Sequence, residues 1–152
     1  MSLVAVGGIR HAFFTRLCEW ELAVILFLWG GILLRDPTLF EGQSWIAFRT
    51  LSDEATIGAT CMMVGAMRLL ILAANGSWRP MYHLRAIAAI LTAGFFFAIT
   101  IGFASSGHVS TWMAVYPVFV IFDIVNALRA AEDAARVDRS LSNAREAMDG
   151  RK

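Results

Sequence analysis

Long apolar segments alternate with short polar ones along this chain, and four of the apolar segments are long enough to cross a lipid bilayer. A helix needs about 20 mostly apolar residues to span roughly 30 Å of hydrocarbon, and it satisfies its own backbone hydrogen bonds there. The apolar residues come in long blocks rather than in a period-two alternation, which favours helices over strands. The sequence therefore predicts an all-α integral membrane four-helix bundle within residues 1–129. The predicted spans are residues 17–34, 54–74, 84–105 and 110–128.

The chain changes character after Arg129, where strong helix formers of mixed charge replace the apolar run. Glu132 and Arg136 have the i,i+4 spacing, in the order that stabilises an isolated helix. Residues 130–152 are therefore expected to continue the fourth span as an extended, amphipathic C-terminal helix in the cytoplasm.

Basic residues are distributed unevenly over the two membrane faces that four spans would create. Arginine and lysine in short loops are retained on the cytoplasmic side. One face carries only Arg35 and Arg49, whereas the chain ends and the second connection carry most of the positive charge. Both termini are therefore placed in the cytoplasm, and the bacterial inner membrane is the expected location. The residues on the cytoplasmic face are Arg10, Arg16, Arg79, Arg85, Arg129, Arg136, Arg139, Arg145, Arg151 and Lys152.

The longest connection, residues 36–53, joins the first two spans and has an apolar residue at every third position near its end. Trp45, Phe48 and Leu51 would lie on one side of a helix. This spacing predicts a short helix lying on the outer membrane surface.

Two features of the spans concern how the helices meet. Gly58 and Gly65 are one heptad apart in the second span, and Gly94 lies in the third, so small residues are expected to permit close helix approach. Pro117 interrupts the fourth span, where it would kink the helix or act as a hinge.

Five ionisable residues fall inside or at the edge of the predicted spans, where each is costly and needs a partner. Arg68 and Asp123 lie at similar depth, because spans two and four run in the same direction. Glu19, Glu21 and Arg85 lie near the same level. These residues predict an intramembrane polar layer, in which Arg68 pairs with Asp123. The layer is interpreted as a structural set of ion pairs, with a polar gate or ion path at the cytoplasmic mouth as the alternative.

The histidine and cysteine residues do not indicate a cofactor. Only His11 and His83 map to one side of the membrane, and His11 precedes the first span, so a bis-histidine haem is not expected. His108 maps to the outer turn. Cys18 and Cys61 are interpreted as small packing residues rather than a disulfide pair. No cofactor and no metal site is predicted.

Two segments in the second half of the chain resemble a pattern in known membrane proteins. Residues 68–85 (RLLILAANGSWRPMYHLR) and 114–131 (AVYPVFVIFDIVNALRAA) are similar to segments of uncharacterised small multi-span proteins of proteobacterial phages and prophages. The resemblance covers the second half of the chain well and the first half poorly. It implies a phage context, in which small multi-span proteins with a charged cytoplasmic tail are often holins. Holins oligomerise in the inner membrane and open it, although most holin classes have fewer than four spans.

The leading functional hypothesis is therefore a holin-like, membrane-permeabilising protein that forms homo-oligomers in the lipid bilayer. One alternative is a structural or accessory membrane protein that binds a protein partner through its tail or its outer loop. The other is a small oligomeric channel or transporter subunit. An enzyme is not expected, because phosphate-loop, nucleophile-elbow and metalloprotease motifs are missing. Nucleic-acid binding is not expected either, because acidic residues balance the basic tail.

Overall fold

The structure is a computed structural model that describes residues 16–77 and 81–149. Every regular element in these two ranges is helical, which confirms the all-α prediction for this part of the chain. Four of the helices are long and apolar enough to cross a membrane. Arg10, His11, Arg79, Arg151 and Lys152, which entered the sequence predictions, lie outside the described residues. The long helices are α2 (Leu17–Arg35), α4 (Glu54–Ser77), α5 (Tyr82–Ser105) and α6 (Trp112–Asp149).

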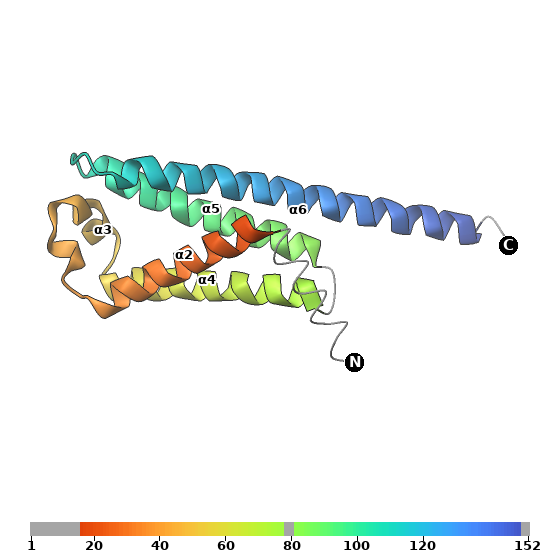
Figure 1. Cartoon of the computed structure of the whole chain (residues 1–152), viewed down its shortest axis with the longest axis horizontal. Coiled ribbons are helices and arrows are strands. Elements are labelled where there is room, and N and C mark those ends of the chain that lie inside the picture. The colour runs from red at the N-terminus through yellow and green to blue at the C-terminus, as the bar shows by residue number, and fades with distance from the viewer. Residues whose placement is uncertain (1–15, 78–80, 150–152) are drawn as a thin grey trace.

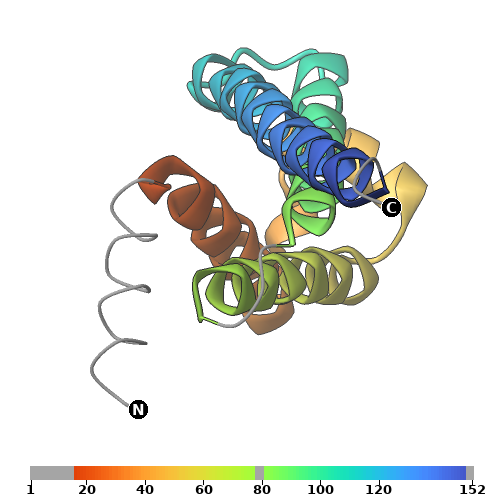
Figure 2. The same ribbon diagram turned by 90° about the vertical axis from the view of Figure 1, so that its right-hand side faces the viewer.

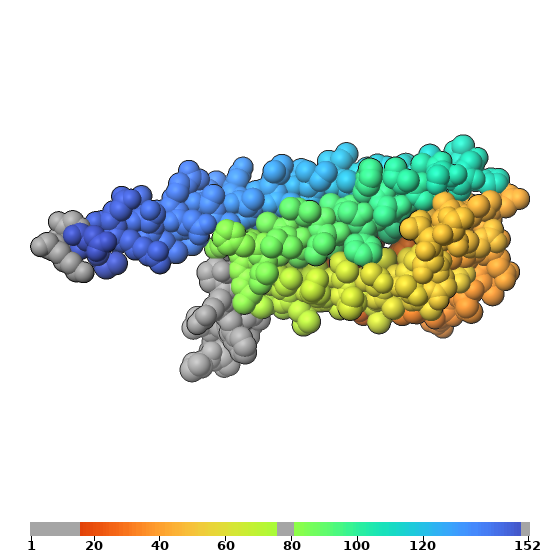
Figure 3. Space-filling view, turned by 180° about the vertical axis from the view of Figure 1, so that it is seen from behind, coloured from red at the N-terminus to blue at the C-terminus, as the bar shows by residue number. Residues whose placement is uncertain are grey.

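The four long helices form two antiparallel pairs that pack side by side, α2 with α4 and α5 with α6 (Figures 1 and 2). Gly107, at a positive φ of 73°, forms part of the tight turn that joins α5 to α6. One continuous helix of 38 residues, α6, covers the fourth predicted span from Trp112 onward and the predicted tail as far as Asp149. Its last turns project beyond the other helices, as the space-filling view also shows (Figures 1 and 3).

Helices α2 and α4 cross in direct backbone contact, which only glycine allows. A Cβ atom added at Gly30 would overlap the carbonyl oxygen of Gly58 and would lie 2.5 Å from the backbone nitrogen of Met62. A Cβ atom at Gly65 would lie 2.7 Å from the backbone nitrogen of Phe27. The predicted close approach at Gly58 and Gly65 is therefore confirmed. Gly94, by contrast, has open space around it, so its predicted packing role is wrong.

The glycines at this crossing give a matched pair of substitutions. Gly30→Ala should lower the free energy of unfolding by about 1–3 kcal/mol, because the overlapping atoms belong to the backbone of α4 and cannot rotate away. Gly31→Ala should leave stability unchanged or raise it by up to about 1 kcal/mol, since no atom lies within 4 Å of that position and alanine favours the helix. Thermal unfolding of the purified protein in detergent, followed by circular dichroism, measures both. Equal losses in the two variants would contradict the crossing.

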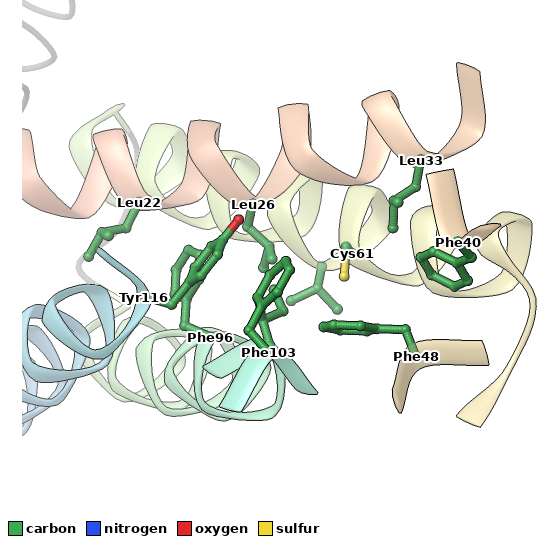
Figure 4. Packing of buried hydrophobic residues seen from close by; sticks show 11 residues of the cluster. Leu22, Leu26, Leu33, Phe40, Phe48, Cys61, Phe96, Phe103 and Tyr116 are labelled. Carbon is green, nitrogen blue, oxygen red and sulfur yellow. The ribbon is translucent and has the colours of Figure 1, made fainter. Parts of the chain in front are cut away.

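Three short helices form the connection between α2 and α4 and close one end of the bundle. They are η1 (Leu39–Glu41), η2 (Gln43–Trp45) and α3 (Ile46–Leu51). The ring centroids of Trp45 and Phe48 lie 5.0 and 5.2 Å from that of Phe103 on α5. Phe40 packs beside Phe48 (Figure 4). The backbone N–H of Phe40 donates to Glu54 Oε1 at 2.9 Å, which ties the connection to α4. The predicted short helix is present, and Trp45 and Phe48 pack on α5, whereas Leu51 is 77% exposed. Its position on the outer membrane surface stays a prediction.

Helix α4 begins with a capping side chain. Asp53 Oδ1 accepts a hydrogen bond from the backbone N–H of Thr56 at 3.0 Å, the usual interaction of an N-cap residue. Hydrogen bonds from Thr56 lower the pKa of Asp53 below its ordinary value. The cap is therefore strongest when Asp53 is ionised.

This cap predicts a pH dependence of stability. Because the pKa of Asp53 is lower in the folded than in the unfolded chain, its contribution is complete at neutral pH. It is lost as the pH falls through the folded pKa, below the ordinary aspartate value of about 4. Asp53→Asn keeps a capping oxygen but does not titrate, so its melting temperature should fall less than that of the wild type between neutral pH and acid. The pKa of Asp36 is also lowered, by hydrogen bonds from Thr38, and its contribution to the pH dependence is the same in both proteins. Parallel acid profiles of the two proteins would count against the cap.

Candidate functional site

A buried ion pair joins α4 to α6 in the interior of the bundle. Arg68 Nη1 donates to Asp123 Oδ2 at 2.7 Å, and Arg68 Nη2 lies 2.6 Å from Asp123 Oδ1. Arg68 and Asp123 expose 1% and 0% of their surface. The pair predicted from the sequence is therefore present, and it is shielded from solvent.

Thr92 on α5 completes this interaction. Its hydroxyl donates to Asp123 Oδ2 at 2.6 Å, and Arg68 Nη1 contacts the same hydroxyl oxygen. Asn126 Nδ2 lies 3.5 Å from Asp123 Oδ1. One carboxylate thus accepts interactions from three helices, so the group fixes the depth of α4, α5 and α6 relative to one another.

A second group of charges lies nearer the end of the bundle from which α6 projects. Arg85 on α5 donates through Nη2 to Asp133 Oδ2 on α6 at 2.9 Å. Its Nε lies 3.2 Å from Glu19 Oε2 on α2. Arg85 and Glu19 expose 3% and 5% of their surface. The two groups together tie each long helix to at least one other by charge, and they contain four of the five residues predicted for the polar layer.

Glu21 does not belong to this layer, and the prediction that it does is wrong. It is exposed, whereas Glu19 is buried. Residues two apart on a helix point to opposite sides, so only one of these two glutamates is able to face the interior. Pro117 lies inside α6, and the helix continues through it without a break (Figure 1). Its role as a hinge stays a prediction.

Sequence reasoning missed Thr92 and Asp133. Thr92 follows Arg85 by seven residues, and Asp133 follows Asn126 by the same interval, so each pair lies on one side of its helix. That heptad spacing was the available signal. It is weak, because a threonine in a span and an aspartate in a charged tail are both common.

Aromatic side chains fill the interior on the other side of the layer. Phe96 lies one turn after Thr92 on α5, and Phe103 and Tyr116 stack with an interplanar angle of 6° (Figure 4). These three side chains expose 0–3% of their surface. In the described ranges, the polar interior between α5 and α6 therefore ends at Thr92, and a single copy has a closed core rather than a continuous polar path.

The remaining candidate ligands are separate from one another. His83 is exposed, and its Nε2 lies 3.4 Å from Asp138 Oδ2, while His108 is exposed in the turn before α6. Cys18 is exposed and Cys61 is buried, and both are free thiols. Across residues 16–77 and 81–149, no three His, Cys, Asp or Glu side chains come together in a way that could hold a metal ion.

Comparisons with protein-family models, with curated proteins and with solved structures found no match. The class of this protein is thus defined by its own residues. It is an all-helical chain with four helices long and apolar enough to cross a membrane, joined in the interior by buried ion pairs.

Proposed function

We propose that this chain is a multi-pass protein of the bacterial inner membrane that holds the end of α6 in the cytoplasm as a binding element for a protein partner. The membrane location is supported by large apolar side chains on the outside of all four long helices. Leu28, Ile32, Leu70, Ile90 and Ile121 each expose more than half of their surface. Exposed apolar area of this extent favours contact with lipid over contact with water.

The orientation is supported by charge. The start of α2 and the projecting end of α6 lie toward the same end of the molecule (Figure 1). Arg16, Arg85 and Arg129 line one cavity at that end. Basic residues beside the spans favour the cytoplasmic side, which supports a cytoplasmic position for both ends of the chain.

The projecting part of α6 is the observation that carries the proposed role. Asp123 and Asp133 fix α6 to α4 and α5. The 16 residues that follow Asp133, up to Asp149, extend for about 24 Å at the helical rise. Residues 138–149 are all exposed. A helix that is anchored rigidly at one end and uncovered at the other is suited to binding a partner with its free part.

A photo-crosslinking amino acid at Leu141, which is 55% exposed on this part of α6, tests the proposal in cells. We expect a covalent adduct of defined mass that is absent when the same group is placed at His108, at the opposite end of the bundle. An adduct with a second copy of the chain would identify a homo-oligomer. Absence of any adduct from Leu141, with the protein verified in the membrane fraction, would overturn the proposed role of the tail.

A holin-like activity is the second candidate, favoured by the small size and by the resemblance of residues 68–85 and 114–131 to phage membrane proteins. Because the core of one copy is closed, a pore of this kind would need several copies around a common axis, and the same holds for a channel or transporter subunit. Neither candidate is an enzyme. Induced expression should then collapse the membrane potential and admit dye, with a changed response in Arg68→Leu. Intact potential at verified expression would leave the accessory role as the better proposal.

A further inference from the structure

A cavity of about 450 Å³ lies at the end of the bundle from which α6 projects. Its walls come from the start of α2, the start of α5 and the middle of α6. Four arginines line it, namely Arg16, Arg85, Arg129 and Arg136, and they outnumber the three carboxylates of Glu19, Glu132 and Asp133. We call this space the arginine cavity.

The arginine that is buried deepest in this wall has a nitrogen without a hydrogen-bond partner. Arg85 uses Nη2 for Asp133 and directs Nε toward Glu19, but its buried Nη1 atom has no hydrogen-bond partner in the structure. Arg16 Nη1 is likewise buried and without a hydrogen-bond partner. A buried guanidinium nitrogen left in this condition is destabilising, and an oxygen anion in the cavity would satisfy it.

The electrostatic environment favours the same kind of ligand. Burial and the neighbouring charge of Arg85 lower the pKa of Arg16, and both arginines line the cavity. Glu19 and Asp133 are already engaged by Arg85. Arg129 and Arg136 are exposed on α6 and form no ion pair with the described residues. Positive charge therefore remains uncompensated at the cavity.

The position of the cavity points to a lipid as the source of the anion. Arg129 follows Trp112 by 17 residues, or about 26 Å of helix, so it lies near the edge of a hydrocarbon layer about 30 Å thick. An apolar groove of about 320 Å³ runs between α2 and α6, which both also contribute to the arginine cavity. Ile25, Trp29 and Phe119 are among the residues that line this groove. Phe119 lies ten residues, or about 15 Å, before Arg129 along α6, within reach of an acyl chain whose phosphate sits at the arginines.

We infer that the arginine cavity binds the phosphate group of an anionic phospholipid from the cytoplasmic leaflet, such as phosphatidylglycerol, with an acyl chain lying toward the groove between α2 and α6. Basic pockets between membrane helices bind lipid headgroups in this way. Such a lipid would join α2 to α6, which contact each other far less than α2 contacts α4 or α5 contacts α6. The inference rests on the membrane location proposed above and is independent of the role proposed for the tail.

The test measures lipid binding to the purified full-length protein in a neutral detergent by native mass spectrometry. The ligands are phosphatidylglycerol, phosphatidylcholine, glycerol 3-phosphate and inorganic phosphate. We expect phosphatidylglycerol to bind most tightly. The double variant Arg129→Gln/Arg136→Gln should weaken that binding by about tenfold or more, because it removes two of the four arginines that line the cavity. Arg139→Gln/Arg145→Gln removes the same charge from α6 outside the cavity and should bind as the wild type does.

Three results would overturn the inference. They are equal binding of phosphatidylglycerol and phosphatidylcholine, equal weakening in the two double variants, and binding of inorganic phosphate as tight as that of the lipid, which would make this a free-phosphate site. Carbonate extraction of cell membranes checks the location separately. A protein that stays in the membrane but shows no lipid preference would refute the inference alone, whereas a protein released into the soluble fraction would refute the membrane location itself.

Discussion

Arg68→Met should lower the free energy of unfolding by about 3–5 kcal/mol, because it leaves the carboxylate of Asp123 buried without its cation. Methionine has a similar length and fills most of the same space, so the loss is chiefly electrostatic. Thr92 would still donate to Asp123, which is too little to compensate a charge in an apolar interior. Unfolding of the purified protein by denaturant titration in detergent, followed by circular dichroism, measures the loss.

Two further variants test whether that loss of stability comes from the ion pair. Exchange of the two charges, with Arg68→Asp and Asp123→Arg in one chain, should recover part of the stability that either single reversal removes. Arg49→Met makes the same change as Arg68→Met at an exposed arginine in the connection between α2 and α4, and it should shift stability by no more than about 0.5 kcal/mol. If Arg68→Met behaves like Arg49→Met, or if the exchange recovers nothing, the pair does not stabilise the bundle.

The Arg68–Asp123 pair was predictable because an ionised side chain within an apolar span must find a partner at its own depth. Both residues lie in spans that run in one direction, so counting residues from the span ends was sufficient to place them together. Asp133 could not be placed in the same way. It follows Glu132 and precedes Arg136, and a segment of mixed charge has the composition of a solvated helix. Only the packing of α6 on α5 brings this aspartate to Arg85.

The rotation of each helix was harder to predict than its extent. A span that is apolar on all sides does not indicate which side meets protein and which meets lipid. Gly58 and Gly65 were correctly identified as packing positions, but Gly94 was not, and Gly30 was not recognised as their partner. Glu21 was assigned to the polar layer for the same reason, since its depth was right and its direction was not.

The connection between α2 and α4 also shows that the sequence predicts an element better than the surface on which it packs. The spacing of Trp45, Phe48 and Leu51 correctly predicted a short helix. The spacing could not distinguish between two apolar surfaces, the membrane and the end of the bundle. Gly102 permits Phe48 to pack on the end of the bundle, because a Cβ atom at that position would lie within 2.7 Å of the Phe48 ring. A glycine on α5, more than fifty residues away in the sequence, thus provides the space for the phenyl ring.

Phe48→Ala should therefore destabilise the protein by about 3–5 kcal/mol, the usual cost of removing a buried phenyl ring. Phe48 exposes 4% of its surface and packs on Phe40, Trp45 and Phe103, so its removal leaves a cavity at the closed end of the bundle. Leu51→Ala is the matched control, since Leu51 is 77% exposed on the same short helix and should cost no more than about 0.5 kcal/mol. Denaturant titration in detergent measures both. If the helix instead lay flat on the membrane, the two substitutions would have similar small effects on unfolding and would both weaken binding of the connection to lipid vesicles.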